Sequence, residues 1–307
     1  MPPALPTSDP GARVAIMFGI SAQVLSGQLL IGLINGSFYA LMSLGLAIIF
    51  GLLHIINFAH GAIYMLGAMC AWLLLAHLGI GYWWALLLSP LIVGAFGMVL
   101  DRLLISRLRN LDPIYGLLLT FGIALMMQSL FQGLFGSSGL PYGIPAELRG
   151  GWNLGFVFLP KYRAWIIVVS ILICFSVWYA IEKTRLGSYL RATNEDPDLV
   201  SAFGVNVPML VTLTFGAGAA LAGFAGVLAG PIYTISPQMG VEMLSVVFAV
   251  VVIGGMGSIL GSIISGFSLG ILEGLTKIFY PEASSVVIFV AMIVVITIRP
   301  SGLLGKY

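Results

Sequence analysis

The chain has 307 residues, of which 60% are hydrophobic and only 8% are charged, whereas soluble domains carry about 25% charged residues. No Asp, Glu, Lys or Arg occurs between Arg13 and Asp101, and a soluble fold cannot bury so long an uncharged stretch. These values exclude a soluble protein, and a formal net charge of +2 is too small to indicate nucleic-acid binding. We predict an all-α polytopic integral membrane protein.

Residues 1–27 are predicted to form a proline-rich tail followed by an uncertain amphipathic or additional spanning element, and residues 28–307 to form the membrane domain. A membrane-spanning helix needs about 20 mostly apolar residues. Stretches of this kind lie near 29–51, 57–78, 83–105, 114–135, 164–182, 209–231, 242–279 and 284–300. The stretch 242–279 is too long for one span, and a helix is expected to break at its Gly254-Gly-Met-Gly-Ser258 run. We therefore expect a bundle of eight to ten transmembrane helices, some of them broken.

Basic residues predict the orientation of the chain in the membrane. Loops 101–112 and 182–198 are both rich in Lys and Arg. The positive-inside rule therefore places both loops in the cytoplasm. The segment 136–163, which is one span away from each loop, is then external.

Few residues have the pattern of an enzyme site. Cys70 and Cys174 lie inside apolar stretches, so we expect neither a disulfide framework nor a cysteine-based metal site. The histidines at positions 54, 60 and 77 lack acidic partners at metal-ligand spacing. The chain has no G-x-x-x-x-G-K-[ST] sequence, which excludes ATP binding through a P-loop. We predict no catalytic residue and no metal site.

The densest group of polar residues at membrane depth is the run Asn57-Phe-Ala-His-Gly61. Asn57 is an acceptable helix N-cap, which would aim backbone N–H groups and the positive end of the helix dipole inward. Such a terminus suits the carboxylate of a small solute. Alternatively, the run is a structural cap in which His60 bonds a neighbouring carbonyl. The sequence leaves both interpretations open.

Other polar residues of the spans have possible roles in transport or in packing. Asn35 and Tyr39 in the preceding span are expected to face the same cavity. Gln128 is expected either to line a pore or to bond across helices. Glu273 and Lys277 lie four residues apart in the order that favours an intrahelical ion pair.

Two stripes of small residues recur at a spacing of four. They are Gly218, Ala222, Gly226 and Gly230, and Ser262, Gly266, Gly270 and Gly274. A stripe of this kind lets another helix approach closely. We favour packing within one subunit over a subunit interface.

The loop that follows residue 182 contains the signals of a short helix outside the membrane. Asn194 or Asp196 is a suitable N-cap, and Pro197 fits the first helical position. Gly204 is expected to end the helix. A short, charged, capped helix of this kind is a docking element for a soluble partner, or else an ordinary connector.

Several of these motifs together resemble a known family. They are Asn35-Gly-Ser-Phe-Tyr-Ala-Leu41, Ile56-Asn-Phe-Ala-His-Gly61, Arg185-Leu-Gly187, Leu190-Arg-Ala192, Gly204-Val-Asn206, Ala222-Gly-Phe-Ala-Gly226, Gly254-Gly-Met-Gly-Ser258 and Arg299-Pro-Ser-Gly-Leu-Leu-Gly305. The chain resembles the LivH-type permease subunits of branched-chain amino acid ABC importers over nearly everything after about residue 28.

This resemblance implies a subunit of the bacterial inner membrane that forms half of a translocation path for amino acids, with branched-chain amino acids as the expected solute. The implied partners are a second, LivM-like permease, two cytoplasmic ATPase subunits that hydrolyse ATP, and an external solute-binding protein. No cofactor is expected in this chain. The candidate path residues are Asn35, Tyr39, Asn57, His60, Gly61 and Gln128, and the candidate ATPase-coupling residues are Arg191, Glu195, Asp198 and Gly204.

The sequence departs from the family pattern at two places. The coupling motif E-A-A-x-x-x-G appears as Asp198-Leu-Val-Ser-Ala-Phe-Gly204, with the spacing kept and the first three residues changed. Ala62 stands where members commonly have Glu, which leaves urea, amides and aromatic acids open as solutes. A stand-alone channel or secondary transporter for a small polar solute is the alternative function.

Overall fold

The computed structural model describes residues 21–53, 57–109, 111–153, 155 and 158–305. Seven helices in this part of the chain are long and apolar enough to cross a membrane. They are α2 (Ala22–Leu53), α3 (Ala59–Leu78), α4 (Tyr82–Leu103), α5 (Pro113–Phe135), α6 (Lys161–Lys183), α9 (Val207–Ala229) and α11 (Ile259–Phe279). The prediction of an all-α polytopic membrane protein is confirmed.

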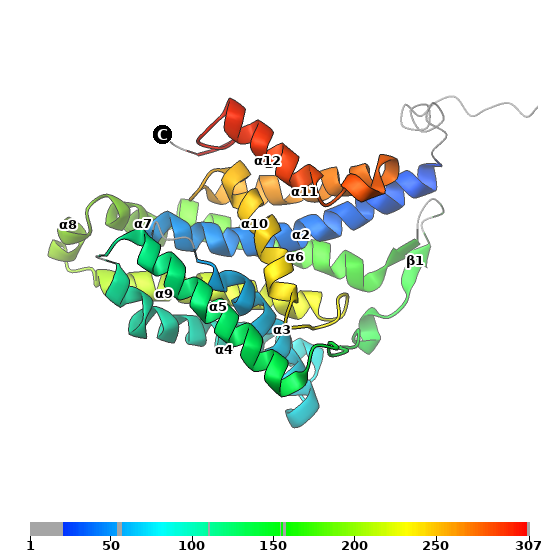
Figure 1. Cartoon of the computed structure of the whole chain (residues 1–307), viewed down its shortest axis with the longest axis horizontal. Coiled ribbons are helices and arrows are strands. Elements are labelled where there is room, and N and C mark those ends of the chain that lie inside the picture. Colours follow the sequence, from blue (N-terminus) through cyan, green and yellow to red (C-terminus); the bar gives the residue numbers. More distant parts are fainter. Residues whose placement is uncertain (1–20, 54–56, 110, 154, 156–157, 306–307) are drawn as a thin grey trace, which may run out of the picture.

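Two further apolar helices, α10 (Met239–Gly254) and α12 (Val287–Ile298), are shorter than a membrane span. At a rise of 1.5 Å per residue they extend about 24 Å and about 18 Å, less than the ~30 Å hydrocarbon core of a bilayer. α10 lies crosswise to the long helices in the middle of the bundle (Figure 1). Neither helix is therefore long enough to cross the bilayer alone. α10 lies inside the bundle, whereas α12 lies at its edge with Ile288 as its one buried residue.

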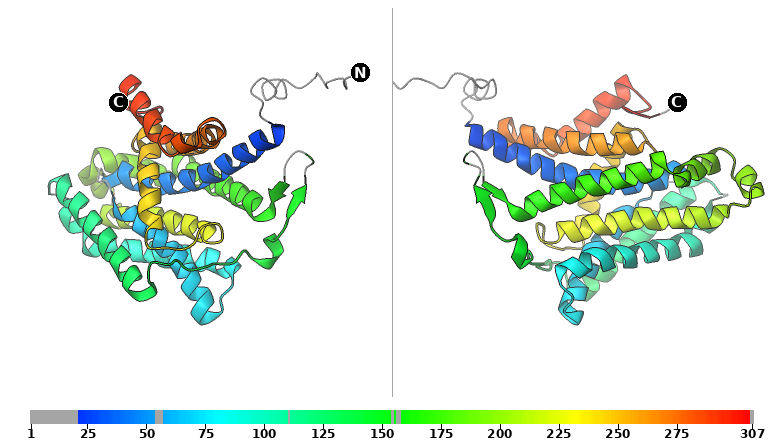
Figure 2. Two further views of the ribbon diagram at one scale, coloured as in Figure 1. Left: turned by 45° about the vertical axis from the view of Figure 1, so that its right-hand side comes forward. Right: turned by 180° about the vertical axis from the view of Figure 1, so that it is seen from behind.

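The two ends of the bundle carry different segments (Figures 1 and 2). The short helices α7 (Arg185–Glu195) and α8 (Pro197–Ala202) project at one end. An antiparallel pair of strands, β1 (Gly151–Asn153) and β2 (Phe158–Pro160), lies at the other end. Because α5 and α6 lie between the two basic loops, those loops share the end that carries α7 and α8. The arrangement agrees with the orientation expected from their charge.

The helix α2, with which the described part of the chain opens, begins before residue 28. Ser21 provides its start, because its hydroxyl oxygen accepts from Val24 N at 3.3 Å. Residues 22–27, which we assigned to the uncertain amphipathic or additional spanning element, are part of α2, a helix of 32 residues. Residues 1–20, which contain most of the predicted tail, lie outside the described residues.

The predicted helix break at Gly254–Ser258 separates α10 from α11. Gly255 and Gly257 adopt positive φ angles of 98° and 85°, which residues other than glycine rarely adopt. The Ser258 hydroxyl caps α11 by accepting from Gly261 N at 3.1 Å. The long apolar stretch thus forms two elements, as its glycine cluster indicates.

The carboxyl-terminal segment completes this break. Leu303 N donates to Ile253 O at 2.8 Å, and Leu304 N donates to Gly254 O at 3.1 Å. A Cβ atom added at Gly302 would lie 2.5 Å from Gly255 N, so the two glycine-rich motifs are in backbone contact. The last carbonyls of α10 are therefore satisfied by a segment distant in sequence.

Both stripes of small residues pack within the chain, as we expected. A Cβ atom at Gly270 would lie 2.3 Å from Gly36 N of α2. A Cβ atom at Gly226 would lie 2.2 Å from Tyr64 O of α3. Backbones approach so closely here that only glycine fits.

A second close contact between α3 and α9 gives a test of this packing. A Cβ atom at Gly67 would lie 2.3 Å from Gly223 O, so Gly67→Ala must push the two backbones apart. We expect a loss of about 1–3 kcal/mol in stability, seen as a lower thermal unfolding midpoint of the purified protein in detergent.

Gly122→Ala in α5 is the matched control, because no atom lies within 4 Å of its added Cβ atom. It should keep the wild-type midpoint or raise it slightly. Equal midpoints for the two variants would contradict the packing account.

Candidate functional site

The amino-terminal end of α3 lies deep in the bundle rather than at its surface. His60 Nε2 lies 3.0 Å from the carbonyl oxygen of Met42, a residue in the middle of α2. A Cβ atom at Gly45 of α2 would meet the His60 ring at 3.1 Å. Met42 lies about 16 Å along the helix from the end of α2 at Leu53. Because the start of α3 contacts Met42, α3 begins well inside the membrane-spanning region.

The first backbone N–H groups of α3 already have partners within the chain. Ala59 N donates to Asn57 Oδ1 at 3.0 Å, and Phe58 N donates to Thr120 Oγ1 of α5 at 3.2 Å. His60 N donates to the Asn57 carbonyl at 3.2 Å. Phe58, and not Asn57 as predicted, occupies the N-cap position, and the Asn57 side chain instead accepts from a backbone N–H two residues later. Because these N–H groups are already bonded, they are not free to bind a solute.

Asn57 and His60 differ in what their side chains face. His60 is completely buried and its Nε2 contacts the Met42 carbonyl, as the structural interpretation of the run expects. Asn57 is 2% exposed, and its Nδ2 has no partner among the described residues. Asn57 therefore offers a free hydrogen-bond donor, whereas His60 packs between helices.

A cavity of about 370 Å³ lies beside Asn57. It is lined by Asn57, Phe58, Gly61, Ala62, Met65, Phe121, Ala124, Leu125, Gln128, Pro237, Gly240, Val241, Leu244, Ser245, Phe248, Phe289 and Met292. These residues belong to α3, α5, α10, α12 and the segment that leads into α10. Phe121 and Leu125 on α5 are 48% and 47% exposed, so the cavity opens at the surface of the chain.

Three of the six predicted path residues line this cavity, namely Asn57, Gly61 and Gln128. Gly61 has a packing reason to be glycine, because a Cβ atom there would lie 2.2 Å from Gly240 O. This contact brings the first turn of α10 against the first turn of α3. The wall of the cavity is thus fixed where two helices begin.

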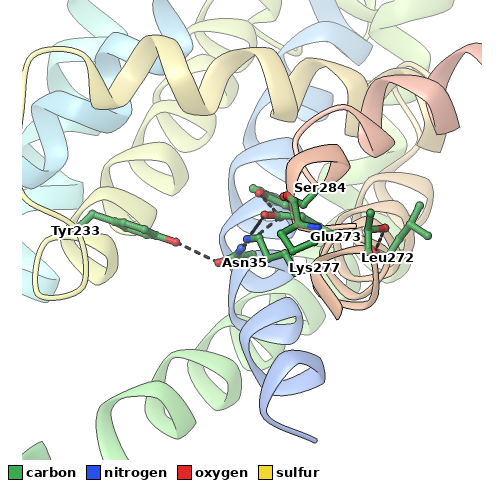
Figure 3. Close-up of polar contacts among 9 residues, drawn as sticks. Asn35, Tyr233, Leu272, Glu273, Lys277 and Ser284 are labelled. Carbon is green, nitrogen blue, oxygen red and sulfur yellow. Dashed lines mark hydrogen bonds and ion pairs between the residues drawn. The ribbon is translucent and has the colours of Figure 1, made fainter. Parts of the chain in front are cut away.

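Asn35 and Tyr39 do not line the cavity, in contrast to our expectation. Both bind Glu273 of α11: Tyr39 OH lies 2.7 Å from Oε2 and Asn35 Nδ2 lies 3.2 Å from the same oxygen (Figure 3). Lys277 Nζ pairs with Glu273 Oε1 at 2.5 Å, which confirms the predicted ion pair. The sequence did not reveal that Glu273 also binds two residues of α2. Gly270, one turn earlier on α11, is likewise packed against α2.

Tyr233 extends this polar cluster to the segment between α9 and α10. Its hydroxyl donates to Asn35 Oδ1 at 3.1 Å (Figure 3). Burial raises the pKa of Tyr233, and the negative charge of Glu273 raises the pKa further. The hydroxyl therefore keeps its proton and remains a donor.

A second buried ion pair lies at the end of the bundle that carries the basic loops. Asp101 is completely buried, pairs with Arg109 and accepts from the Thr212 hydroxyl at 2.6 Å. The bond to Thr212 holds the end of α4 against α9, and the pair with Arg109 holds the following loop against α4. They explain how a charged residue is tolerated at this position.

The predicted docking element comprises two helices instead of one. Asp196 caps α8 by accepting from Leu199 N at 2.9 Å, and Gly204 adopts φ 84°, as its expected helix-ending role requires. Asp198 lies on α8, whereas Glu195 ends α7. Both acidic residues are exposed.

Arg191 on α7 turns back toward the bundle. It lies 3.6 Å from the Glu182 carboxylate and donates to Ile181 O at 3.2 Å. It also lines a cavity of about 550 Å³ between α2, α6, α7 and the break before α11. Sequence reasoning missed Phe203, which follows α8 and is 80% exposed. Because Phe203 is exposed next to the end of α8, we add it to the docking candidates.

Comparison with known proteins shows that the chain is similar to permease components of transport systems. A family model described as "Branched-chain amino acid transport system / permease component" matches residues 28–296. The chain is 32% identical to the high-affinity branched-chain amino acid transport system permease protein LivH of Escherichia coli (strain K12), over 91% of this chain and 95% of that protein. It is 33% identical to the permease protein BraD of Pseudomonas aeruginosa, with the same coverage. The permease protein LivM of Escherichia coli is 28% identical over 87% of this chain and 67% of its own length. No solved structure matches the chain.

The Glu273 cluster predicts a graded response to substitution. Glu273→Ala removes the acceptor of three donors and should cost about 1–3 kcal/mol, measured as a lower thermal unfolding midpoint in detergent. Lys277→Ala removes a partner whose side chain is 32% exposed, so its effect should be below about 1 kcal/mol. Equal losses in the two variants would show that the ion pair alone, and not the whole cluster, stabilises the contact.

Proposed function

Because the chain belongs to the family of permease components of branched-chain amino acid transport systems, we propose that it forms half of the amino acid translocation path of an ABC importer. The observation that carries this proposal is the family match, which covers residues 28–296 and hence almost the whole set of described helices. The chain is a multi-pass permease of the bacterial inner membrane.

We assign four further subunits to the working importer. One is a second permease, since the relatives of this chain include proteins named LivH and a protein named LivM. Two are cytoplasmic ATPases that hydrolyse the ATP, because this sequence has no P-loop motif. The fourth is an external protein that delivers the solute. The opening of the Asn57 cavity at the chain surface supports a path completed by the second permease.

The proposed coupling route runs from α8 to the Asn57 cavity through packed helices. α8 contacts α7, and α7 packs against α6 and α2. α2 in turn carries Met42, whose carbonyl contacts His60 at the start of α3. An ATPase that moves α8 would thereby act on the wall of the cavity. The exposed residues Asp198 and Phe203 are the proposed contacts with that ATPase.

Transport by the purified complex tests the proposed function. We expect proteoliposomes that contain both permeases and both ATPases to take up leucine when ATP and the solute-loaded binding protein are supplied. Uptake should stop when a non-hydrolysable ATP analogue replaces ATP. Leucine transport by this chain alone, without ATP, would instead establish a stand-alone channel or secondary transporter.

The coupling assignment predicts the effect of Gly204→Val. Gly204 has φ 84° and no atom within 4 Å of an added Cβ, so the variant is strained by about 1–2 kcal/mol without a steric clash. We expect the end of α8 to shift and the ATP-driven uptake of leucine to be lost, while membrane insertion stays near normal.

Gly150→Val is the matched control at the opposite end of the bundle. Gly150 has φ 80° and likewise no atom within 4 Å of its added Cβ. The backbone strain is similar, but no coupling contact is expected there. If both variants transport at the wild-type rate, the docking element lies elsewhere, with the loop 101–112 as the next candidate.

A further inference from the structure

Of the ten buried side-chain atoms without a hydrogen-bond partner in the described chain, Asn57 Nδ2 is the one whose residue lines the 370 Å³ cavity. The side-chain oxygen of Asn57 accepts a hydrogen bond from Ala59 N, whereas its Nδ2 is buried and has no partner among the described residues. Buried polar groups in native proteins are nearly always hydrogen-bonded, so an open donor at such a place calls for a ligand. The wall of the 370 Å³ cavity is where that ligand would lie.

The chemistry of the cavity narrows the choice of ligand. Its wall is mostly hydrocarbon, with the rings of Phe58, Phe121 and Phe248 and the side chain of Leu244 among its members. Among the residues that the structure describes, no Asp, Glu, Lys, Arg or His contributes to the wall. A solute with a charged side chain would therefore lose its hydration without finding a counter-charge. A solute with many polar groups, such as urea, would leave most of them unpaired.

The position of Asn57 favours an anionic group on the ligand. Asn57 lies two residues before α3, a helix of 20 residues whose amino-terminal end carries a partial positive charge. The N–H groups of Phe58, Ala59 and His60 are already bonded, whereas Asn57 Nδ2 is an unpaired donor at this end of the helix. The hydrogen bond and the helix dipole would act on the same group.

We propose that Asn57 Nδ2 donates to the α-carboxylate of an amino acid whose hydrocarbon side chain occupies the apolar part of the cavity. This proposal rests on the proposed function. The ammonium group faces the acceptors that the wall provides, the Gln128 amide oxygen and the Ser245 hydroxyl. Ser245 donates its proton to the Glu242 carbonyl at 3.0 Å, so its oxygen remains free to accept. Asn57 is thus a specificity residue for small amino acids with apolar side chains.

Two substitutions separate this role from the structural role of the side-chain oxygen. Asn57→Asp has nearly the same shape and keeps an oxygen that accepts from Ala59 N, but it replaces the donor by a negatively charged acceptor. Asn57→Ala removes both the acceptor and the donor. If Asn57 serves only as this acceptor, Asn57→Asp is the milder variant. If it binds a carboxylate, Asn57→Asp is at least as harmful, because the new charge repels the ligand.

The experiment measures initial leucine uptake in proteoliposomes that contain the complete importer, normalised to the amount of assembled complex. We expect Asn57→Asp to lower the maximal rate at least about tenfold, the factor for loss of a hydrogen bond to a charged group, and by no less than Asn57→Ala. Its thermal unfolding midpoint should lie above that of Asn57→Ala.

Asn153→Asp is the matched control, since the Asn153 side-chain oxygen accepts from Gly155 N two residues later, as Asn57 does from Ala59 N. Asn153 lies in β1, at the opposite end of the bundle from α8, and its variant should transport normally. Wild-type uptake by Asn57→Asp, or failure of both Asn57 variants to assemble, would overturn the inference. Absence of leucine uptake by the wild-type complex would instead refute the proposed function.

Discussion

The arrangement of this protein depends on one requirement, that backbone polar groups at membrane depth find partners within the protein. A helix that starts inside the bundle creates unpaired N–H groups where no bulk water is present. The start of α3 meets this requirement with Asn57 and with Thr120 of the neighbouring α5. These contacts satisfy the start of the helix but leave the Asn57 Nδ2 donor unpaired, and this is the donor to which we assign the solute in our proposal.

Local signals in the sequence were sufficient wherever a structure is decided by a few consecutive residues. The cap at Asp196, the positive φ of Gly204 and the break at Gly254–Ser258 all follow from residue types whose backbone preferences are strong. The apolar stretches likewise predict the long helices, because their length is set by the thickness of the bilayer. The predicted span began near residue 29, whereas α2 begins at Ala22, because no marked change in composition shows where the helix starts.

Contacts between distant segments were beyond such reasoning. Helical spacing shows that Asn35 and Tyr39 lie about one turn apart, but not that Glu273 of α11 is their common partner. The depth in the membrane at which α3 starts is a matter of three-dimensional arrangement, and amino-acid composition does not predict it. Three of the six candidate path residues line the cavity beside α3, while the other three contact neighbouring helices, and a role in transport stays a prediction for all six. Phe203 escaped notice because one apolar residue in a loop is unremarkable until its exposure is known.

The contact between the carboxyl-terminal segment and the end of α10 has a consequence for biosynthesis. A polypeptide leaves the ribosome from its amino to its carboxyl end, so Leu303 and Leu304 emerge after α10 and α11 have already been made. Until then the carbonyls of Ile253 and Gly254 lack the donors that they have in the finished protein. The joint between the two helices is consequently among the last parts of the molecule to be completed during insertion. A nascent chain interrupted before residue 303 would carry all of its long helices and yet lack the bonds that fix α10 across them.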